Sequence, residues 1–130
     1  MATHSPTDVA AAIKAYDVRG VVGEGAGFLN EEFVRDVAAS FARLMREEGA
    51  QQIVIGHDMR DSSPRLAAAF ADGVNAQGLN TVTLGLTSTD ELYYASGVKQ
   101  CPGAMFTASH NPAKYNGIKL CRAGARPVGQ

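Results

Sequence analysis

Short apolar runs alternate with amphipathic helical patterns along most of the chain, and this alternation restricts the possible fold more than any other feature. The run Ile53-Val54-Ile55 is β-branched and lacks polar alternation, as expected for a strand that is buried on both faces. The pattern over about 31–48 predicts a helix, with Asn30 as its N-cap and Gly49 at its end. Such an alternation predicts an α/β domain in which helices cover both faces of a layered sheet.

Two further helices follow from the same signals. One is expected to begin at the cap Ser63, with Pro64 in its first turn, and to end at Gly78. A short helix is expected over 90–96, because Gly97 is a typical residue for ending a helix.

Three further apolar runs predict strands over 81–84, 104–107 and 117–121. Together with the run centred on residue 54, they predict a mixed, mostly parallel sheet of about four strands. We expect residues 13–130 to form a single domain, and residues 1–12 to be a partly disordered N-terminus.

Composition is that of an ordinary globular protein with one core. The chain has 130 residues, of which 45% are hydrophobic and 19% charged, and it shows no apolar stretch long enough to span a membrane. The formal net charge of -1 gives no reason to expect nucleic acid or a membrane surface as a partner. Cys101 and Cys121 form no CxxC pair, which predicts a reduced, cytoplasmic protein with neither a zinc site nor a disulfide.

Charge is distributed unevenly along the sequence. The last acidic residue is Glu91, and the charged residues after it are all basic: Lys99, Lys114, Lys119, Arg122 and Arg126. A stretch without carboxylates suits an anionic ligand, and it suits a solvated basic edge equally well. Charge alone does not separate these two interpretations.

Four polar segments near the ends of predicted strands carry most of the reactive and anion-binding groups. They are Tyr16-Asp17-Val18-Arg19-Gly20, His57-Asp58-Met59-Arg60-Asp61-Ser62-Ser63, Thr107-Ala108-Ser109-His110-Asn111-Pro112 and Asn116-Gly117-Ile118-Lys119. Ligands of α/β sheets bind at loops outside the carboxyl ends of strands. The sequence therefore places the candidate site in these four segments.

Ser109 directly follows a predicted strand and is the candidate nucleophile. A serine hydroxyl needs a base, a cation or a metal nearby. His110 is adjacent, but neighbouring side chains of an extended segment point in opposite directions, so a Ser-His hydrolase pair fits poorly. The G-x-S-x-G elbow is absent as well. A polar turn in which these side chains satisfy backbone groups is the structural alternative.

The segment Thr107 to Pro112, T-A-S-H-N-P, continued by Tyr115-Asn116-Gly117-Ile118-Lys119, resembles the phosphoserine signature of the α-D-phosphohexomutase superfamily. The phosphomannomutase/phosphoglucomutase branch is the most similar. Ala15 to Gly20 and Gly56 to Ser63 also resemble first-domain motifs of that family, in the same order. The resemblance implies the first domain of a multidomain mutase.

Such a mutase transfers a phosphoryl group reversibly. The resemblance implies that Ser109 carries the group and donates it to a hexose 1-phosphate or hexose 6-phosphate. A hexose 1,6-bisphosphate forms, reorients, and returns its other phosphate to the serine. The implied metal is Mg²⁺, which this chain would contact only through the phosphoryl oxygen on Ser109.

The resemblance also implies roles for individual side chains. Lys119 would act as acid and base, whereas Arg19 would orient groups and stabilise charge, because arginine is too basic to serve as a general base. The remaining implied site residues are His110, which orients the serine loop and hydrogen-bonds the phosphoryl group, and Asn111, Tyr16 and Arg60, which position the loop and the substrate. For an isolated Lys or Arg, a solvated strand end is the simpler explanation.

Other polar residues of these segments have structural explanations. Asp17 and Asp58 can anchor their loops through backbone hydrogen bonds as readily as they can touch a ligand. Ser62 and Ser63 are expected to cap a helix. We therefore leave these four residues outside the predicted site.

The family's aspartate-rich metal motif, D-G-D-x-D-R, is absent from this chain, and so are its later sugar-recognition and phosphate-binding loops. We therefore expect the remaining domains of the same enzyme as partners, and no turnover by this chain alone. Two alternatives stay open. One is a phosphoglucosamine mutase, which is disfavoured because that branch opens with a G-T-D-G-I-R-G-like motif where this sequence has Tyr16-Asp17-Val18-Arg19-Gly20. The other, from a different functional class, is a free-standing phosphate-binding or regulatory module.

Overall fold

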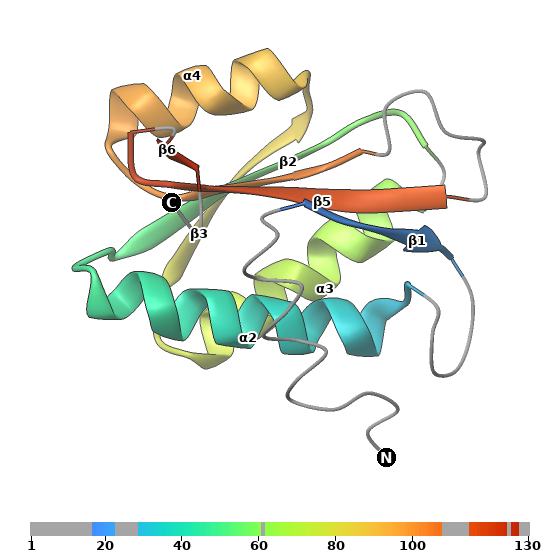
Figure 1. The fold of residues 1–130 in the computed structure, drawn as a ribbon, viewed down its shortest axis with the longest axis horizontal. Coiled ribbons are helices and arrows are strands. Elements are labelled where there is room, and N and C mark those ends of the chain that lie inside the picture. The colour runs from blue at the N-terminus through green and yellow to red at the C-terminus, as the bar shows by residue number, and fades with distance from the viewer. Residues whose placement is uncertain (1–16, 23–28, 61, 108–114, 125, 128–130) are drawn as a thin grey trace.

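The computed structural model describes residues 17–22, 29–60, 62–107, 115–124 and 126–127, which form a layered α/β fold (Figure 1). The elements in chain order are β1 (Asp17–Val21), α2 (Glu31–Glu47), β2 (Gln52–His57), α3 (Ser63–Ala76), β3 (Asn80–Leu86), α4 (Thr89–Lys99), β4 (Gly103–Phe106), β5 (Tyr115–Arg122) and β6 (Arg126–Pro127). The partly disordered segment predicted over 1–12 lies outside the described residues.

All the named strands belong to one mixed sheet, which confirms the predicted α/β class. The strand order is β1-β5-β4-β2-β3, and β6 also pairs with β5. β2 is parallel to β3 and β4, whereas β5 is antiparallel to β1, β4 and β6. The sheet has six strands rather than the expected four or so, because β1 and β6 pair with successive parts of β5.

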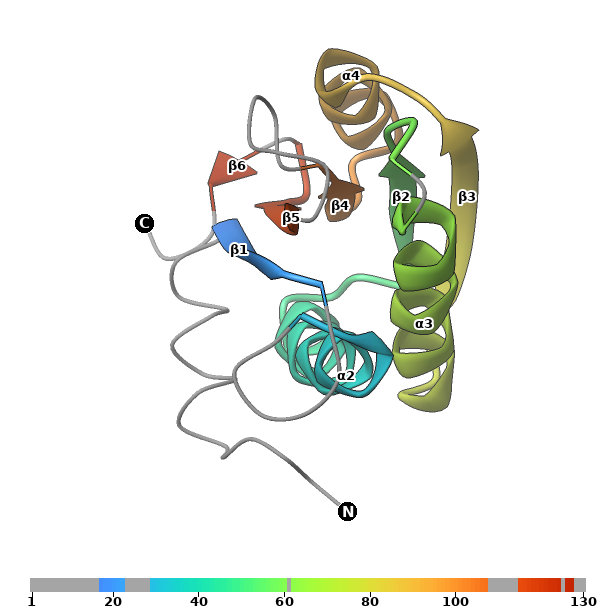
Figure 2. The same cartoon turned by 90° about the vertical axis from the view of Figure 1, so that its right-hand side faces the viewer.

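Helices cover both faces of the sheet, as the sequence predicts. Figure 2 shows α2 and α3 together on one face and α4 on the other. The larger core lies between the sheet and the first two helices, where the ring of Phe70 lies 6.3 Å from that of Phe41 and 5.6 Å from that of Phe106. On the α4 side, Leu92 packs with Met105 in a smaller cluster.

Helix α2 begins and ends where its local signals predict. The Asn30 side chain accepts a hydrogen bond from the Phe33 amide at 2.9 Å, and two glutamates follow in the first turn. Gly49, just beyond the end, has a φ of +96°, a conformation that glycine adopts without a steric penalty.

The start of α3 and the end of α4 differ from the sequence prediction. Ser62 is the N-cap of α3 but its side chain makes no capping hydrogen bond, and the hydroxyl of Ser63 is bonded elsewhere. α4 runs through Gly97 to Lys99, because Gln100 takes the left-handed conformation, with a φ of +52°, and its side chain donates to the carbonyl of Gly97 at 2.6 Å. Tertiary contacts therefore explain the missing cap at the start of α3, and a local side-chain hydrogen bond explains the later end of α4.

Candidate functional site at one edge of the sheet

The sheet topology brings three of the four polar segments to one end of the strands. They are the segments that follow β2, that follow β4 and that begin β5. His57 at the end of β2 lies in register with Phe106 at the end of β4. β5 returns antiparallel beside β4, so its first residues pair with the end of β1, with Val21 opposite Tyr115. The described parts of these segments, although far apart in the sequence, therefore lie close together at the carboxyl ends of β2 and β4.

Two of the polar segments belong to strands that pair with each other. Residues 17–20 lie in β1 and residues 116–119 in β5, with Arg19 opposite Gly117. Each strand supplies the partner for the hydrogen bonds of the other. The sequence of either segment alone does not reveal this pairing.

Asp58 organises the turn between β2 and α3. Its Oδ1 accepts hydrogen bonds from the Arg60 amide at 3.0 Å and from the Ser63 hydroxyl at 2.6 Å, while its Oδ2 lies 3.3 Å from Nε of Arg60. The amide of Asp58 donates to the carbonyl of Phe106 at 3.0 Å, which ties the turn to the end of β4. The structure thus gives Asp58 the anchoring role, which is one of the two options that the sequence leaves open.

Arg60, a predicted substrate-binding residue, is mostly buried beside Asp58, with 13% of its side chain exposed. This contact lies within the turn between β2 and α3, whereas the serine loop that Arg60 is predicted to steady lies outside the described residues. The neighbouring His57 is half-buried, and its Nδ1 lies 2.9 Å from the carbonyl oxygen of Asp58.

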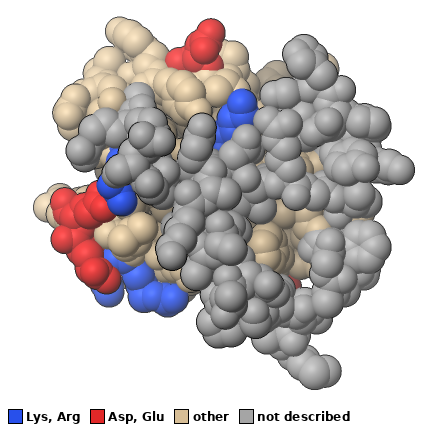
Figure 3. Space-filling model, viewed as in Figure 1, with Lys and Arg blue, Asp and Glu red and all other residues tan. Residues whose placement is uncertain are grey.

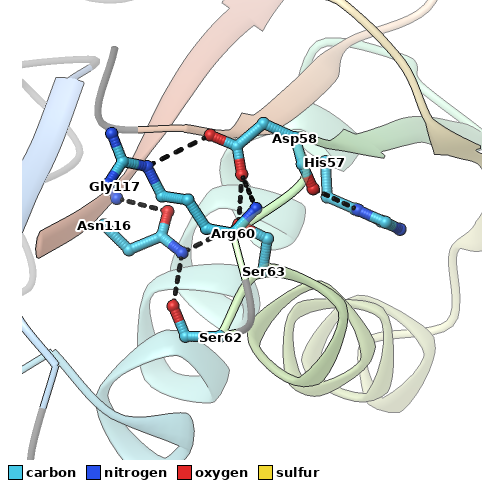
Figure 4. Close-up of polar contacts among 7 residues, drawn as sticks. All are labelled: His57, Asp58, Arg60, Ser62, Ser63, Asn116 and Gly117. Atoms are coloured by element: carbon cyan, nitrogen blue, oxygen red, sulfur yellow. Dashed lines mark hydrogen bonds and ion pairs between the residues drawn. The ribbon is translucent and has the colours of Figure 1, made fainter. Parts of the chain in front are cut away.

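Asn116 connects β5 to the start of α3 (Figure 4). Its Nδ2 donates to the hydroxyls of Ser62 at 2.8 Å and Ser63 at 2.9 Å, and its Oδ1 accepts from the amide of Gly117 at 2.8 Å. The next hydrogen bond along the strand pair joins the Thr107 amide to the Gly117 carbonyl at 3.0 Å. The end of β4, the start of β5 and the first turn of α3 are therefore joined by hydrogen bonds.

Sequence reasoning misses the part that these residues play. It assigns Ser62 and Ser63 to capping alone, and it includes Asn116 only as part of a motif. One signal is present in the sequence: Asn116 occupies the alternate position with Ile118 and Leu120, both of which are buried in the core. A polar residue where the pattern calls for an apolar one indicates a special requirement.

Some of the predicted site residues lie within the described parts of the chain and others lie outside them. Lys119 is half-buried on β5, opposite Met105 of β4, and its neighbours Ile118 and Leu120 face the core under α2 and α3. Because side chains alternate along a strand, Lys119 projects from the other face of the sheet. The predicted residues that lie outside the described parts of the chain are Tyr16, Ser109, His110 and Asn111.

Charges of opposite sign lie near one another on the described surface. On the face shown in Figure 3, acidic and basic side chains are neighbours at one end of the molecule. Arg122, from the stretch that lacks carboxylates in sequence, forms an ion pair with Glu48 at 3.3 Å. The fold therefore supplies to this stretch at least one carboxylate that its own sequence lacks.

The described residues offer no ready-made metal site. Among them, no group of three or more His, Cys, Asp or Glu side chains is arranged to hold a metal ion. Cys101 and Cys121 are free and buried, and burial raises the pKa of both thiols. No helix among the described residues is both long enough and apolar enough to cross a bilayer.

Comparisons with known proteins agree on one family. The family model described as phosphoglucomutase/phosphomannomutase, alpha/beta/alpha domain I, matches residues 10–130. The chain is 42% identical over 118 residues to phosphohexose mutases of Xanthomonas campestris pv. campestris, covering 90% of this chain and 25% of that protein. It is 38% identical over 116 residues to the phosphomannomutase of Escherichia coli (strain K12), covering 88% and 24%.

Solved structures give the same result. A phosphoglucomutase/phosphomannomutase family protein from Burkholderia thailandensis superposes with a TM-score of 0.80 at 33% identity, over 92% of this chain and 27% of that one. A putative phosphomannomutase from Thermus thermophilus gives 0.76 at 32% identity, over 85% and 25%. The chain thus spans about a quarter of the length of these relatives.

Proposed function

Because the chain belongs to the phosphoglucomutase/phosphomannomutase family, as its α/β/α domain I, we propose that it supplies the phosphoserine of a phosphohexomutase. The full-length enzyme would interconvert hexose 1-phosphate and hexose 6-phosphate. The observation that carries the proposal is the arrangement of the segments. The segment that contains Ser109 begins at the end of β4, and the turn after β2 and the start of β5 are hydrogen-bonded to its two flanks.

The proposed reaction consists of two transfers of opposite direction. In the first, the bond between phosphorus and Oγ of Ser109 breaks while the free hydroxyl of the hexose phosphate forms a new bond to phosphorus. That hydroxyl loses its proton, and Oγ of the serine accepts one. The hexose 1,6-bisphosphate then reorients within the site, and the second transfer returns its other phosphate to the serine.

We assign Lys119 to the proton transfers and Arg19 to orientation and charge stabilisation. Support for Lys119 comes from its half-buried position on β5, close in sequence to the Asn116 connection. Arg19 lies opposite Gly117 in the adjoining strand, so the two cationic residues occupy neighbouring strands. A transition state that spreads negative charge over phosphoryl oxygens is stabilised by positioned cations.

His110, Asn111 and Tyr16 are proposed to contact the phosphoryl group and the sugar. Arg60 is proposed to act mainly through its turn, since its Nε faces Asp58. The free, buried thiols suit a reducing compartment, and we propose that the protein works in the cytoplasm.

Mg²⁺ is the metal that the family resemblance implies, and it would neutralise charge on the transferred phosphoryl group. The described residues do not provide a ligand set for it. We therefore derive no step through the metal. Apart from the phosphoryl oxygen on Ser109, its ligands are proposed to come from the rest of the longer protein, which also supplies the remaining contacts to the sugar.

The decisive experiment uses the full-length protein incubated with a hexose 1,6-bisphosphate. Intact mass and peptide mapping should locate one phosphate on Ser109, and Ser109→Ala should remove both the phosphate and the mutase activity. Phosphate on another residue, or full activity in Ser109→Ala, would contradict the proposal.

A second variant tests the proton-transfer role. Lys119→Ala should slow phosphoryl transfer by about 10²-fold or more, a typical loss for a general acid-base group, with little change in melting temperature. Lys99→Ala, which removes an exposed cation from the end of α4, is the matched control and should leave the rate unchanged. Equal effects of the two variants would favour a purely structural function for Lys119.

A further inference from the structure

Asn116 is a fully buried polar residue on the face of β5 where the next two residues, Ile118 and Leu120, are apolar. Its exposed fraction is 0%, the same as for Ile118 and Leu120 on the same face. Burying an amide lowers the stability of the folded state unless its hydrogen bonds are satisfied. An apolar residue here would avoid that cost, so the stability of the core alone does not explain an asparagine at this position.

Two of the hydrogen bonds of Asn116 join residues that are far apart in the sequence. The donors of its amide group serve hydroxyls that lie more than fifty residues away, those of Ser62 and Ser63. Ser63, which is also fully buried, donates its own proton to Asp58 at 2.6 Å. The hydroxyl of Ser63 therefore accepts on one side and donates on the other, which fixes its orientation.

These bonds form a closed circuit around the base of one segment. Asp58 is bonded through its amide to the carbonyl of Phe106, and the following Thr107 amide is bonded to Gly117. The Gly117 amide in turn is bonded to Asn116. Residues 108–115 connect Thr107 to Asn116, so both ends of the segment that contains Ser109 are tied to the turn between β2 and α3.

We propose that Asn116 is a positioning residue: it holds the two ends of the Ser109 segment in register with the turn that starts α3. The consequence for catalysis rests on the function proposed above. Phosphoryl transfer depends on alignment, and a displacement of about 1 Å can slow a reaction by about 10²-fold. Asn116 acts through the Gly117 amide, from which its Oδ1 accepts a hydrogen bond, and through the Thr107 amide, which is bonded to the Gly117 carbonyl.

Kinetics of the full-length protein test the catalytic consequence. Asn116→Ala should lower kcat for mutase turnover by about ten- to a hundredfold and leave KM within about twofold, because geometry is lost while binding groups remain. Asn116→Asp, which keeps the shape and the acceptor for the Gly117 amide but loses the donors to both serines, should show the same pattern. It keeps the test informative if the alanine variant does not fold.

Ser96→Ala is the matched control. Ser96 is also fully buried and bonds the carbonyl of Cys101 at 2.6 Å, but it lies on α4, away from the circuit. It should lower the melting temperature and leave kcat unchanged. A kcat for both Asn116 variants that falls no further than that of Ser96→Ala would overturn the proposal.

Amide hydrogen exchange separates failure of this proposal from failure of the proposed function. In Asn116→Ala, exchange of the Gly117 and Thr107 amides should accelerate by at least about tenfold relative to that of Val54, which is bonded to Pro102 at 3.0 Å in the middle of the sheet. Equal acceleration at all three amides, or none, would overturn the positioning role even in an active enzyme. A selective response in a protein that takes no phosphate on Ser109 would leave the positioning role standing and reject the mutase function.

Discussion

Cys101 and Cys121 show how burial sets the chemistry of a single side chain. Both thiols are almost inaccessible, with 4% and 2% exposure, and desolvation is the main cause that raises their pKa. The thiolate is the reactive form, so a raised pKa and a closed environment both suppress reaction.

We therefore expect both cysteines to resist a thiol reagent in the native chain. At pH 8, a colorimetric disulfide reagent should label neither residue before unfolding and both once urea is added. Labelling should follow the unfolding transition seen by circular dichroism. Fast labelling of one thiol in buffer would show that its surroundings open without global unfolding.

Helices α2 and α3 cross at a point where only glycine fits. A Cβ on Gly73 would lie 2.6 Å from the carbonyl oxygen of Arg35 and 2.7 Å from Cβ of Ala38. Gly73→Ala should therefore destabilise the chain by about 1–3 kcal/mol, the usual cost of overpacking. Gly97→Ala is the matched control, because nothing lies within 4 Å of the added carbon in α4.

In the control, the loss of glycine's backbone freedom should instead stabilise the helix by up to about 1 kcal/mol. Urea denaturation of the two variants measures both effects. Opposite signs are expected, and a stability gain in Gly73→Ala would mean that the two helices move apart at no cost.

The start of α4 contains a capping box that responds to pH. Ser88 accepts from the Glu91 amide at 3.0 Å, and the Glu91 carboxylate accepts from the Ser88 amide at 2.9 Å. The backbone bond to Ser88, then the hydroxyls of Ser88 and Thr87, lower the pKa of Glu91. A lowered folded pKa means that the carboxylate stabilises the fold above its unfolded pKa, and that this contribution is lost as pH falls through the folded value.

We expect the stability difference between the wild-type chain and Glu91→Gln to depend on pH accordingly. The difference in stability should be largest at neutral pH and should disappear as pH is lowered past the folded pKa of Glu91. The side chains of Glu91 and of the substituted glutamine are then both uncharged. Urea denaturation at a series of pH values measures the difference. A difference that is constant over this range would show that the charge of Glu91 does not contribute.

Local signals predict the elements whose causes are local. Ile53 to Ile55 form a buried strand, and Asn30 and Gly49 bound α2, because each effect acts within a few residues. The capping role predicted for Ser63 is wrong because its hydroxyl has a choice of partners. Its bonds to Asp58 and Asn116 depend on the assembled sheet, and no local pattern carries that information.

The candidate site shows the same division. Reactive and anion-binding groups near the ends of predicted strands identify the four segments. The strand order shows that the segments after β2, after β4 and at the start of β5 meet at one end of the strands. The pairing of β1 with β5 is not predictable, because neither the D-V-R-G of β1 nor the Y-N-G of β5 resembles a typical strand. The hydrogen bonds around Asn116 form only when β5 lies against β4. They therefore could not be predicted without the strand order.

At the scale of the whole molecule, one reversal of direction creates the arrangement. β2, β3 and β4 run parallel, so their carboxyl ends point to the same edge. β5 then returns antiparallel beside β4 and brings its first residues to that edge as well. Polar segments that are far apart in the sequence therefore contribute to one surface.

The 130-residue chain by itself differs from its relatives in length and in the ligands it offers to a metal. The chain spans about a quarter of its relatives, and its described residues contain no cluster that could hold a metal ion. Phosphoryl transfer relies on cations that neutralise the developing charge. We therefore expect the 130-residue chain to show no mutase turnover in a coupled assay with hexose 1-phosphate, hexose 1,6-bisphosphate and Mg²⁺, while the full-length protein turns over at the same concentration. Ser109→Ala in the full-length protein provides the background rate. Turnover by the short chain that disappears in its own Ser109→Ala variant would show that this domain carries a complete site.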